Sequence, residues 1–294
     1  MDIETLKLFC DVIYLKGFTQ AALANSITQS AVSQRLKSLE KRFGIPLIER
    51  HGTDLRLTKA GETVYRSARR ILSEFREVEE RLQEMKGRGG GSVKVAAIYS
   101  VGLYELDPFL KQFLNNHPDI DVEIEYGRAN KIYQDIISGS IDLGIVAYPP
   151  RKPQLSSISL SDDELVLICR PDHAFPEREL ISLKQLNSQP FVTFHRDLPT
   201  RRAIDEILKR HGISVITKAE FDNIELIKRA VEIGLGISLV PSVTVKSEIQ
   251  AGQLRALSLM EGPFTRPIAV LYRRGRSLPL SVKKFIAVVT ADKK

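Results

Sequence analysis

Residues 18–44 read FTQAALANSITQSAVSQRLKSLEKRFG, and this stretch decides the fold of the first part of the chain. The alanine-rich segment after Thr19 predicts a short helix, because Thr19 can cap it and small side chains let a second helix pack closely. Asn25 and Ser26 favour a turn, and Thr28 predicts the N-cap of the next helix. Two helices joined in this way form a helix-turn-helix, whose second helix lies in the DNA major groove.

The second helix is predicted to bury one apolar stripe and to end at Gly44. Four residues at spacings of four, three and four form the stripe: Val32, Leu36, Leu39 and Phe43. Such spacing is typical of an amphipathic helix with one face in a core. The expected core partners come from the preceding segments: Leu6, Phe9, Ile13 and Leu23.

The opposite face of this helix is polar and carries no acid before Glu40. Glutamine pairs with N6 and N7 of adenine, and serine donates or accepts at any base edge. A solvated surface is the ordinary alternative, but it would favour Glu and Lys. The predicted DNA contacts are one residue of the first helix and five of the second: Thr19, Gln29, Ser30, Ser33, Gln34 and Lys37.

A short turn at Gly52-Thr53-Asp54 follows, between candidate strands at 47–49 and 55–57. Its flanks are cationic: Arg50, His51, Arg56 and Lys59. We interpret it as a hairpin wing in which Arg50 and Arg56 hold phosphates and fix the register on DNA. The alternative is a solvated turn. Residues 1–58 are thus expected to form a winged helix-turn-helix DNA-binding domain.

Charge supports a nucleic-acid partner. A chain of 294 residues with a formal net charge of +7 suits two or three domains. Between Arg35 and Arg70 there are ten Lys or Arg and four Asp or Glu, so most of the excess lies beside the proposed groove-reading helix.

Cysteine usage and hydropathy indicate the compartment. Cys10 and Cys169 are far apart and lack metal-type spacing. We expect both to be core thiols of a reducing compartment, with a redox-sensing thiol as the alternative. Because no run is long enough to span a bilayer and no secretion signal opens the chain, a cytoplasmic protein without membrane contact is predicted. No metal or cofactor is expected.

Residues 59–86 predict a long linker helix. Apolar residues recur at spacings of four and three for three heptads: Val64, Ala68, Ile71, Phe75, Val78, Leu82 and Met85. This 3.5-residue period is typical of a coiled-coil seam and favours dimerisation. The alternative is packing on the chain's own core. Glycines at 87, 89, 90 and 91 then predict a hinge over 87–92.

After the hinge, strand and helix patterns alternate, which indicates a parallel sheet flanked by helices. Expected strands are 93–98, 120–126, 141–147, 165–169, 191–194, 237–240 and 268–272. Expected helices are 106–114, 130–137, 201–211, 223–233 and 280–289. Open α/β sheets bind ligands at the carboxyl ends of their strands. Ser100, Arg128, Thr193 and Arg201 are therefore candidates for an anion site, although each also has an ordinary structural role available.

The whole chain resembles a LysR-type transcriptional regulator. In the first part, the shared motifs are Ala21-Ala22-Leu23, QSAVS at 29–33, Leu39-Glu40, Phe43-Gly44, Pro46-Leu47, Arg50 and LTKAG at 57–61. In the second part, they are GSIDLGI at 139–145 and AVEIGLGISLVP at 230–241. Ile48 departs from the Phe usual in the family, and Ser100-Val101-Gly102 departs from the Thr-x-Thr that some members carry.

The resemblance implies a periplasmic-binding-protein-like effector domain over 93–294. Its first subdomain would comprise 93–163 and 268–294, and its second 164–267. The family's effector positions fall on Ser100, Val101, Gly102, Arg128, Tyr148, Thr193 and His195. The implied partners are double-stranded DNA, a small anionic effector, RNA polymerase and further copies of the chain in a homotetramer.

Three other classes remain as alternatives. A ligand-independent architectural DNA-binding protein would not need two α/β subdomains. An enzyme is disfavoured because the chain shows no Gly-rich phosphate loop, nucleophile elbow, His-Glu metal spacing or catalytic triad. A solute-binding protein would need a secretion signal and no DNA-reading unit.

Overall fold

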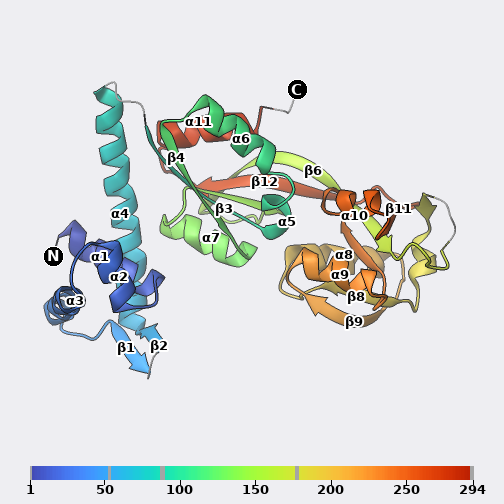
Figure 1. The fold of residues 1–294 in the computed structure, drawn as a ribbon, viewed down its shortest axis with the longest axis horizontal. Coiled ribbons are helices and arrows are strands. Elements are labelled where there is room, and N and C mark those ends of the chain that lie inside the picture. The colour runs from blue at the N-terminus through green and yellow to red at the C-terminus, as the bar shows by residue number, and fades with distance from the viewer. Residues whose placement is uncertain (1, 52–53, 87–89, 176–178, 292–294) are drawn as a thin grey trace. The chain divides into compact units, whose positions relative to one another are not determined.

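The computed structural model describes residues 2–51, 54–86, 90–175 and 179–291. The chain forms two compact units, Met1–Gly90 with Ile137–Ser140, and Gly91–Ile136 with Ile141–Lys294. We call them the N-terminal and C-terminal units and treat each by itself (Figure 1). The predicted hinge at 87–92 lies partly outside the described residues, and its last two residues belong to a strand.

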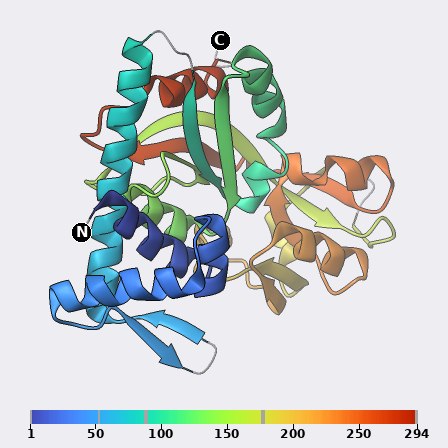
Figure 2. The same cartoon turned by 60° about the vertical axis from the view of Figure 1, so that its left-hand side comes forward.

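The N-terminal unit is a helix-turn-helix with a hairpin and a long helix. Its elements are α1 (Ile3–Tyr14), α2 (Phe18–Ala24), α3 (Gln29–Phe43), β1 (Ile48–His51), β2 (Asp54–Leu57) and α4 (Lys59–Met85). β1 and β2 pair antiparallel, with Glu49 opposite Arg56. Figure 2 shows this hairpin beside α3. The winged helix-turn-helix is thus present, although the tip of its wing at 52–53 is outside the described residues.

Local capping explains where α3 begins and ends. The Thr28 hydroxyl accepts a hydrogen bond from the backbone N–H of Ala31 at 3.2 Å, as an N-cap does. Gly44 ends the helix in the left-handed region, at φ +68°. The expected cap at Thr19 is wrong, because α2 begins at Phe18 and Gly17 is its N-cap. The extended backbone of Gly17 starts the helix two residues earlier than the sequence pattern indicated.

The core of the N-terminal unit confirms most of the predicted stripe. Its buried residues are Leu8, Phe9, Val12, Ala21, Ala22, Val32, Leu36, Leu39 and Leu47. Phe43, the last residue of α3, is 44% exposed, and Leu23 is 70% exposed. These two expectations were wrong: α2 buries its alanines rather than Leu23, and the stripe of α3 leaves the core at its final turn.

Only the first two residues of the apolar stripe on α4 pack against the core of the N-terminal unit. Val64 packs partly buried against the core of the N-terminal unit, and Ala68 is buried with Leu6 and Cys10. The remaining five stripe residues are exposed: Ile71, Phe75, Val78, Leu82 and Met85. Most of the predicted seam is therefore uncovered in a single chain.

The first subdomain of the C-terminal unit is a mixed sheet with helices. It contains β3 (Gly91–Ala97), α5 (Tyr99–Gly102), α6 (Asp107–Asn116), β4 (Ile120–Tyr126), α7 (Ala129–Ser138), β5 (Leu143–Ala147) and α11 (Leu280–Val289). β3 pairs in parallel with β4 and β5, as expected. β5 also pairs with β12 (Thr265–Arg273), but antiparallel, so the sheet as a whole is mixed. The chain enters β12 from the second subdomain, in the opposite direction.

The second subdomain contains most of the elements that the sequence pattern did not indicate. Its members are β7 (Leu180–Ile181), η1 (Leu183–Leu186), β8 (Pro190–Phe194), α8 (Pro199–Arg210), β9 (Ile216–Phe221), α9 (Ile224–Glu232), β10 (Ser238–Pro241), η2 (Ser242–Val245), α10 (Lys246–Gln250) and β11 (Arg255–Leu259). β10 and β11 pair antiparallel with β6 (Leu155–Cys169), while β8 and β9 form a separate parallel pair.

Two long strands connect the subdomains. β6 and β12 pair antiparallel from Leu155↔Arg273 to Glu164↔Thr265, with a register shift at Ile268/Ala269. β6 contributes its first half to the first subdomain and its second half to the second (Figure 1). The two proposed boundaries, 163/164 and 267/268, fall inside these strands.

Candidate nucleic-acid interface and ligand cleft

The outward face of α3 carries the predicted DNA contacts. Gln29, Ser30, Gln34 and Lys37 are exposed and Ser33 is half-buried. Thr19 of α2 is exposed as well. Ser30 Oγ lies 2.9 Å from Thr28 Oγ1, so its hydroxyl is tied to the helix cap. α3 therefore presents short polar groups and a cation over two turns.

Glu40, the first acid on α3, is engaged by the protein. One carboxylate oxygen accepts hydrogen bonds from the backbone N–H groups of Leu47 at 2.7 Å and Ile48 at 3.2 Å. It thereby anchors the segment that leads from α3 into the wing. The sequence pattern showed Glu40 only as the end of the acid-free face.

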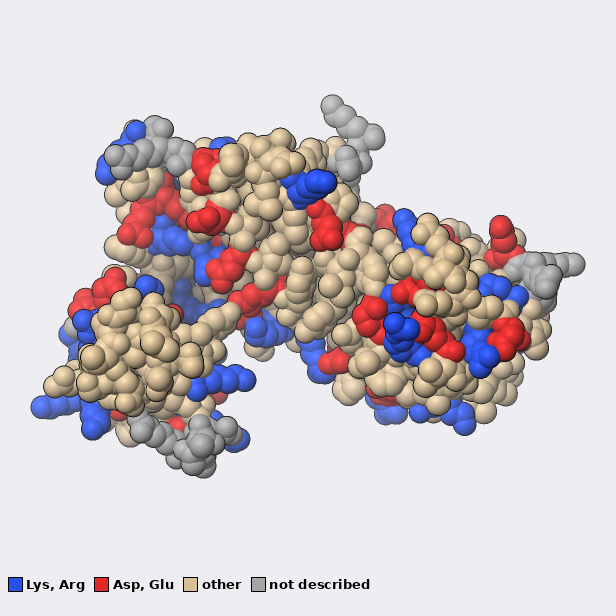
Figure 3. All heavy atoms as spheres, in the orientation of Figure 1, with Lys and Arg blue, Asp and Glu red and all other residues tan. Residues whose placement is uncertain are grey.

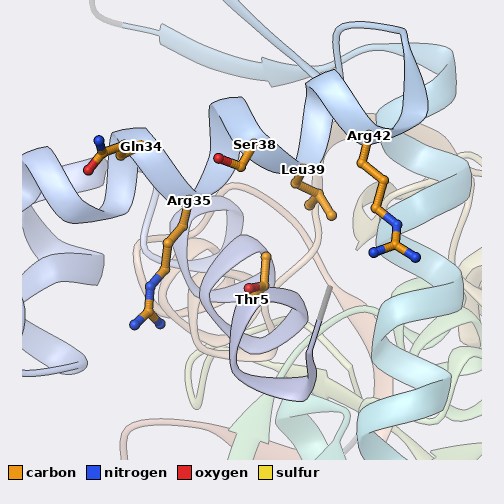
Figure 4. Close-up of a pocket in the computed structure, with 6 residues that line it drawn as sticks. All are labelled: Thr5, Gln34, Arg35, Ser38, Leu39 and Arg42. Atoms are coloured by element: carbon orange, nitrogen blue, oxygen red, sulfur yellow. The ribbon is translucent and has the colours of Figure 1, made fainter.

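A groove of about 310 Å³ runs between α1 and α3. It is lined by Thr5, Gln34, Arg35, Ser38, Leu39 and Arg42 (Figure 4). Figure 4 shows Arg35 and Arg42 extending from α3 on the side of Thr5, while Gln34 points away from them. These two arginines were not among the predicted contacts. In the sequence, their spacing of seven residues, about two helical turns, indicates that they lie on the same flank of the helix.

Exposed cations of the N-terminal unit lie on α3 and on the hairpin. Lys37, Lys41 and Arg42 on α3 and Arg56 on β2 are exposed, and Figure 3 shows Lys and Arg atoms along the rim of this unit. Arg50 belongs to β1, but its side chain is not among those described. Cations flanking a groove-reading helix favour contact with phosphates.

The C-terminal unit has a pocket where the two subdomains meet, at the carboxyl ends of β3, β4, β5, β8 and β9. Its walls from the first subdomain are Ile98, Tyr99, Ser100, Gly127, Arg128, Ala129 and Ala147. Its walls from the second are Phe194, Leu198, Pro199, Thr200, Asp222 and Ile224. The free space is about 50 Å³, well below the roughly 300–1,000 Å³ of small-molecule sites.

Ser100 is supported from behind by a buried arginine. Arg266 Nη1 donates to Ser100 Oγ at 3.0 Å, and Arg266 is only 1% exposed. Its guanidinium lies 3.5 Å from Glu105 and 3.8 Å from Asp163. Burial lowers the pKa of Arg266, and the two carboxylates oppose this change. A lone arginine at the start of the apolar strand β12 was the only signal for this residue in the sequence.

Arg128, the second predicted residue in the pocket, is paired across the subdomain boundary with Asp197 and Asp222. Hydrogen bonds to Asp222 raise the pKa of Arg128. Conversely, the hydrogen bond to Arg128 lowers the pKa of Asp222. The pKa of Asp197 is lowered mainly by His195, whose Nδ1 lies 2.6 Å from the Asp197 carboxylate.

The other predicted effector residues do not line this pocket. Val101 and Gly102 are buried, and a side chain at Gly102 would collide with the Tyr126 ring. Tyr148 packs half-buried on the first-subdomain core, and burial raises its pKa to about 12. His195 is exposed beside the pocket.

Thr193 and Arg201 have different surroundings. Thr193 is 2% exposed, and its hydroxyl has no hydrogen-bond partner among the described residues. Arg201 is buried and donates to Asp205, Glu220 and the Phe194 carbonyl. Arg201, a candidate for binding an anion, therefore anchors α8 to β8 and β9 instead.

Within the described ranges, no group of three or more His, Cys, Asp or Glu side chains has an arrangement suited to a metal ion. Nor does any helix in that part of the chain have the length and apolar character to cross a bilayer.

A winged helix-turn-helix, a long apolar-striped helix and an α/β unit with a cleft between two subdomains define a DNA-binding regulator of the ligand-responsive class. Residues 3–62 match the bacterial regulatory helix-turn-helix protein family lysR, and residues 86–293 match the LysR substrate binding domain. The chain belongs to the LysR family of transcriptional regulators.

Known proteins agree with this assignment. The chain is 30% identical to the RuBisCO operon transcriptional regulator of Allochromatium vinosum, over 99% of this chain and 96% of that protein. A full-length OxyR variant from Pseudomonas aeruginosa has the same fold, with a TM-score of 0.79 at 23% identity over 99% of this chain and 98% of that one. The regulatory domain of Synechocystis PCC6803 CcmR in complex with 2-PG aligns with a TM-score of 0.64 at 27% identity, covering 69% of this chain and 96% of that one.

Proposed function

We propose that this regulator reads a partly palindromic promoter site through Gln29, Ser30, Ser33 and Gln34 of α3. The observation that carries the proposal is the exposed, almost acid-free face of that helix. Lys37, Arg56 and Arg50 hold phosphates beside it, and Thr19 contacts DNA from α2. The two reading helices of a dimer bind two half-sites, which gives the site its symmetry.

The dimer is assembled through the exposed seam of α4, and two dimers form a homotetramer in the cytoplasm. Supporting this, five large apolar side chains of α4 remain exposed in the single chain. A paired helix covers such a stripe in a coiled coil. DNA bending by the assembly then changes contact with RNA polymerase.

A small anionic effector controls the assembly from the cleft that holds Ser100 and Arg128. A hydroxyl beside a cation suits a carboxylate or phosphate, and the related Synechocystis regulatory domain was solved in complex with 2-PG. A ligand changes the assembly only if it binds one arrangement of the subdomains better than another. Ligand-independent architectural binding, the competing function, predicts no change in DNA binding with any anion. The related proteins are transcriptional regulators, which disfavours an enzymatic activity of the α/β unit.

The test uses the full-length protein and separates residues that read bases from residues that hold phosphates. Gln29→Ala and Gln34→Ala should each lose roughly 1–3 kcal/mol of discrimination between a selected duplex and a random one, because each removes a base-edge contact. Lys37→Ala should weaken both duplexes equally and reduce the salt slope by about 1. Fluorescence anisotropy at several salt concentrations measures both effects.

Gln83→Ala is the matched control, since Gln83 is an exposed glutamine of α4 outside the reading face. It should leave discrimination and salt slope unchanged. Full discrimination in both α3 glutamine variants would remove these residues from the reading role.

A further inference from the structure

The cleft between the subdomains is crossed by ion pairs of the protein itself. Arg128 precedes α7 in the first subdomain, whereas Asp197 follows β8 and Asp222 follows β9 in the second. Arg128 Nη1 lies 3.1 Å from Asp197 Oδ2. Arg128 Nε and Nη2 lie 3.2 Å and 2.5 Å from Asp222 Oδ2. All three guanidinium nitrogens therefore donate to the opposite subdomain.

A second polar contact joins the same two subdomains. The hydroxyl of Tyr104, which follows α5, accepts a hydrogen bond from Lys228 Nζ on α9 at 2.6 Å and donates to Glu225. Lys228 is buried and also donates to the Thr244 carbonyl and to Glu248. The contact made by Arg128 thus belongs to a closed arrangement with more than one bridge.

In this arrangement the cleft has little room for an anionic ligand, and Arg128, the cation among its described lining residues, is already paired. The volume is about 50 Å³, and each guanidinium nitrogen of Arg128 already donates to an aspartate. Two carboxylates face the one guanidinium of Arg128 at this boundary. An incoming anion must therefore compete with these carboxylates for Arg128.

We propose that Arg128, Asp197 and Asp222 form a clasp that holds the cleft closed, and that an anionic effector must displace the two aspartates from Arg128. The role of the effector rests on the proposed function, whereas closure by the ion pairs can be tested on the chain alone. Exposed ion pairs are individually weak and screened by salt. The clasp is consequently easy to release, as a ligand-operated contact must be.

The experiment measures closure directly in the full chain, without DNA or effector. Nitroxide labels are attached to cysteines introduced at two exposed positions, Lys111 on α6 and Lys209 on α8. Labelled chains are diluted with unlabelled ones so that electron–electron dipolar spectroscopy reports distances within one chain. Both native cysteines are buried and are expected not to take the label.

Arg128→Ala should lengthen and broaden the distance distribution. The double variant Asp197→Asn with Asp222→Asn should do the same while keeping the guanidinium, which guards against a folding defect in the first variant. Salt at about 1 M should lengthen and broaden the distance distribution of the wild type, and it should leave that of Arg128→Ala unchanged. Lys131→Ala is the matched control, because Lys131 pairs with Glu125 and Asp135 inside the first subdomain.

Unaltered distances in folded Arg128→Ala and in the double aspartate variant would overturn the clasp. Equal opening by Lys131→Ala would overturn it as well, because the effect would then not depend on the bridge. Since no DNA or effector is present, either result leaves the proposed reading of DNA to be judged by its own binding assay.

Discussion

At the scale of single residues, the ends of α3 and its connection to the wing are set by side chains and backbone conformations that satisfy backbone groups. Thr28 and Gly44 delimit α3 as predicted, because a cap and a left-handed residue have few substitutes. Glu40 and Arg266 were missed as anchors, since Glu40 bonds backbone groups beyond the end of its own helix and Arg266 bonds Ser100 in a remote part of the chain. Ser100 and Arg128 could be placed in the cleft from the strand order, but the pairing of Arg128 with two aspartates could not.

The two thiols provide a prediction at this scale. Burial raises the pKa of Cys10 to about 12 and also raises that of Cys169. Because the thiolate is the reactive form, both should be almost fully protonated and inert at about pH 8. Ellman's reagent should therefore modify neither cysteine in the native chain, while both react fully in guanidinium chloride. A native thiol that reacts as fast as free cysteine would support the alternative of a redox sensor.

At the scale of elements, periodicity predicted amphipathic helices well and polar strands poorly. α11 was predicted at its observed bounds, and α4 within one residue, because each carries an apolar stripe. The first ten residues of β6 read LSSISLSDDE and lack the apolar run that identified the other strands. Its strand conformation comes from pairing with β12, which is a long-range contact that no local pattern reveals.

The exposed seam of α4 provides the prediction for an element. Phe75→Glu places a charge in the seam, and an unpaired charge in an apolar interface is strongly unfavourable. We expect the dissociation constant of the dimer to rise on the order of 100-fold. Sedimentation velocity over a range of concentrations measures this change. Arg70→Glu introduces the same side chain on the side of α4 away from the seam and should leave the sedimentation coefficient unchanged. Equal behaviour of the two variants would place the dimer contact elsewhere.

At the scale of the whole molecule, the order of units followed from the sequence, but their internal design followed only in part. The helix-turn-helix, long helix and α/β unit were each signalled by a local pattern. The antiparallel β12 and the β10–β6–β11 arrangement were not, because strand direction depends on where the chain crosses between subdomains. A closed cleft is likewise a property of two assembled subdomains and has no local signature.

The most direct measurement is selection of binding sites from a random duplex library by the full-length protein. Two copies of α3 held by paired α4 helices should enrich a partly palindromic motif, with half-site centres separated by about 10–10.5 base pairs or a multiple of that distance. The motif should disappear for the combined Gln29→Ala and Gln34→Ala variant while salt-sensitive binding to any duplex remains. Enrichment of no motif, or of a single unpaired half-site by the wild type, would contradict the account.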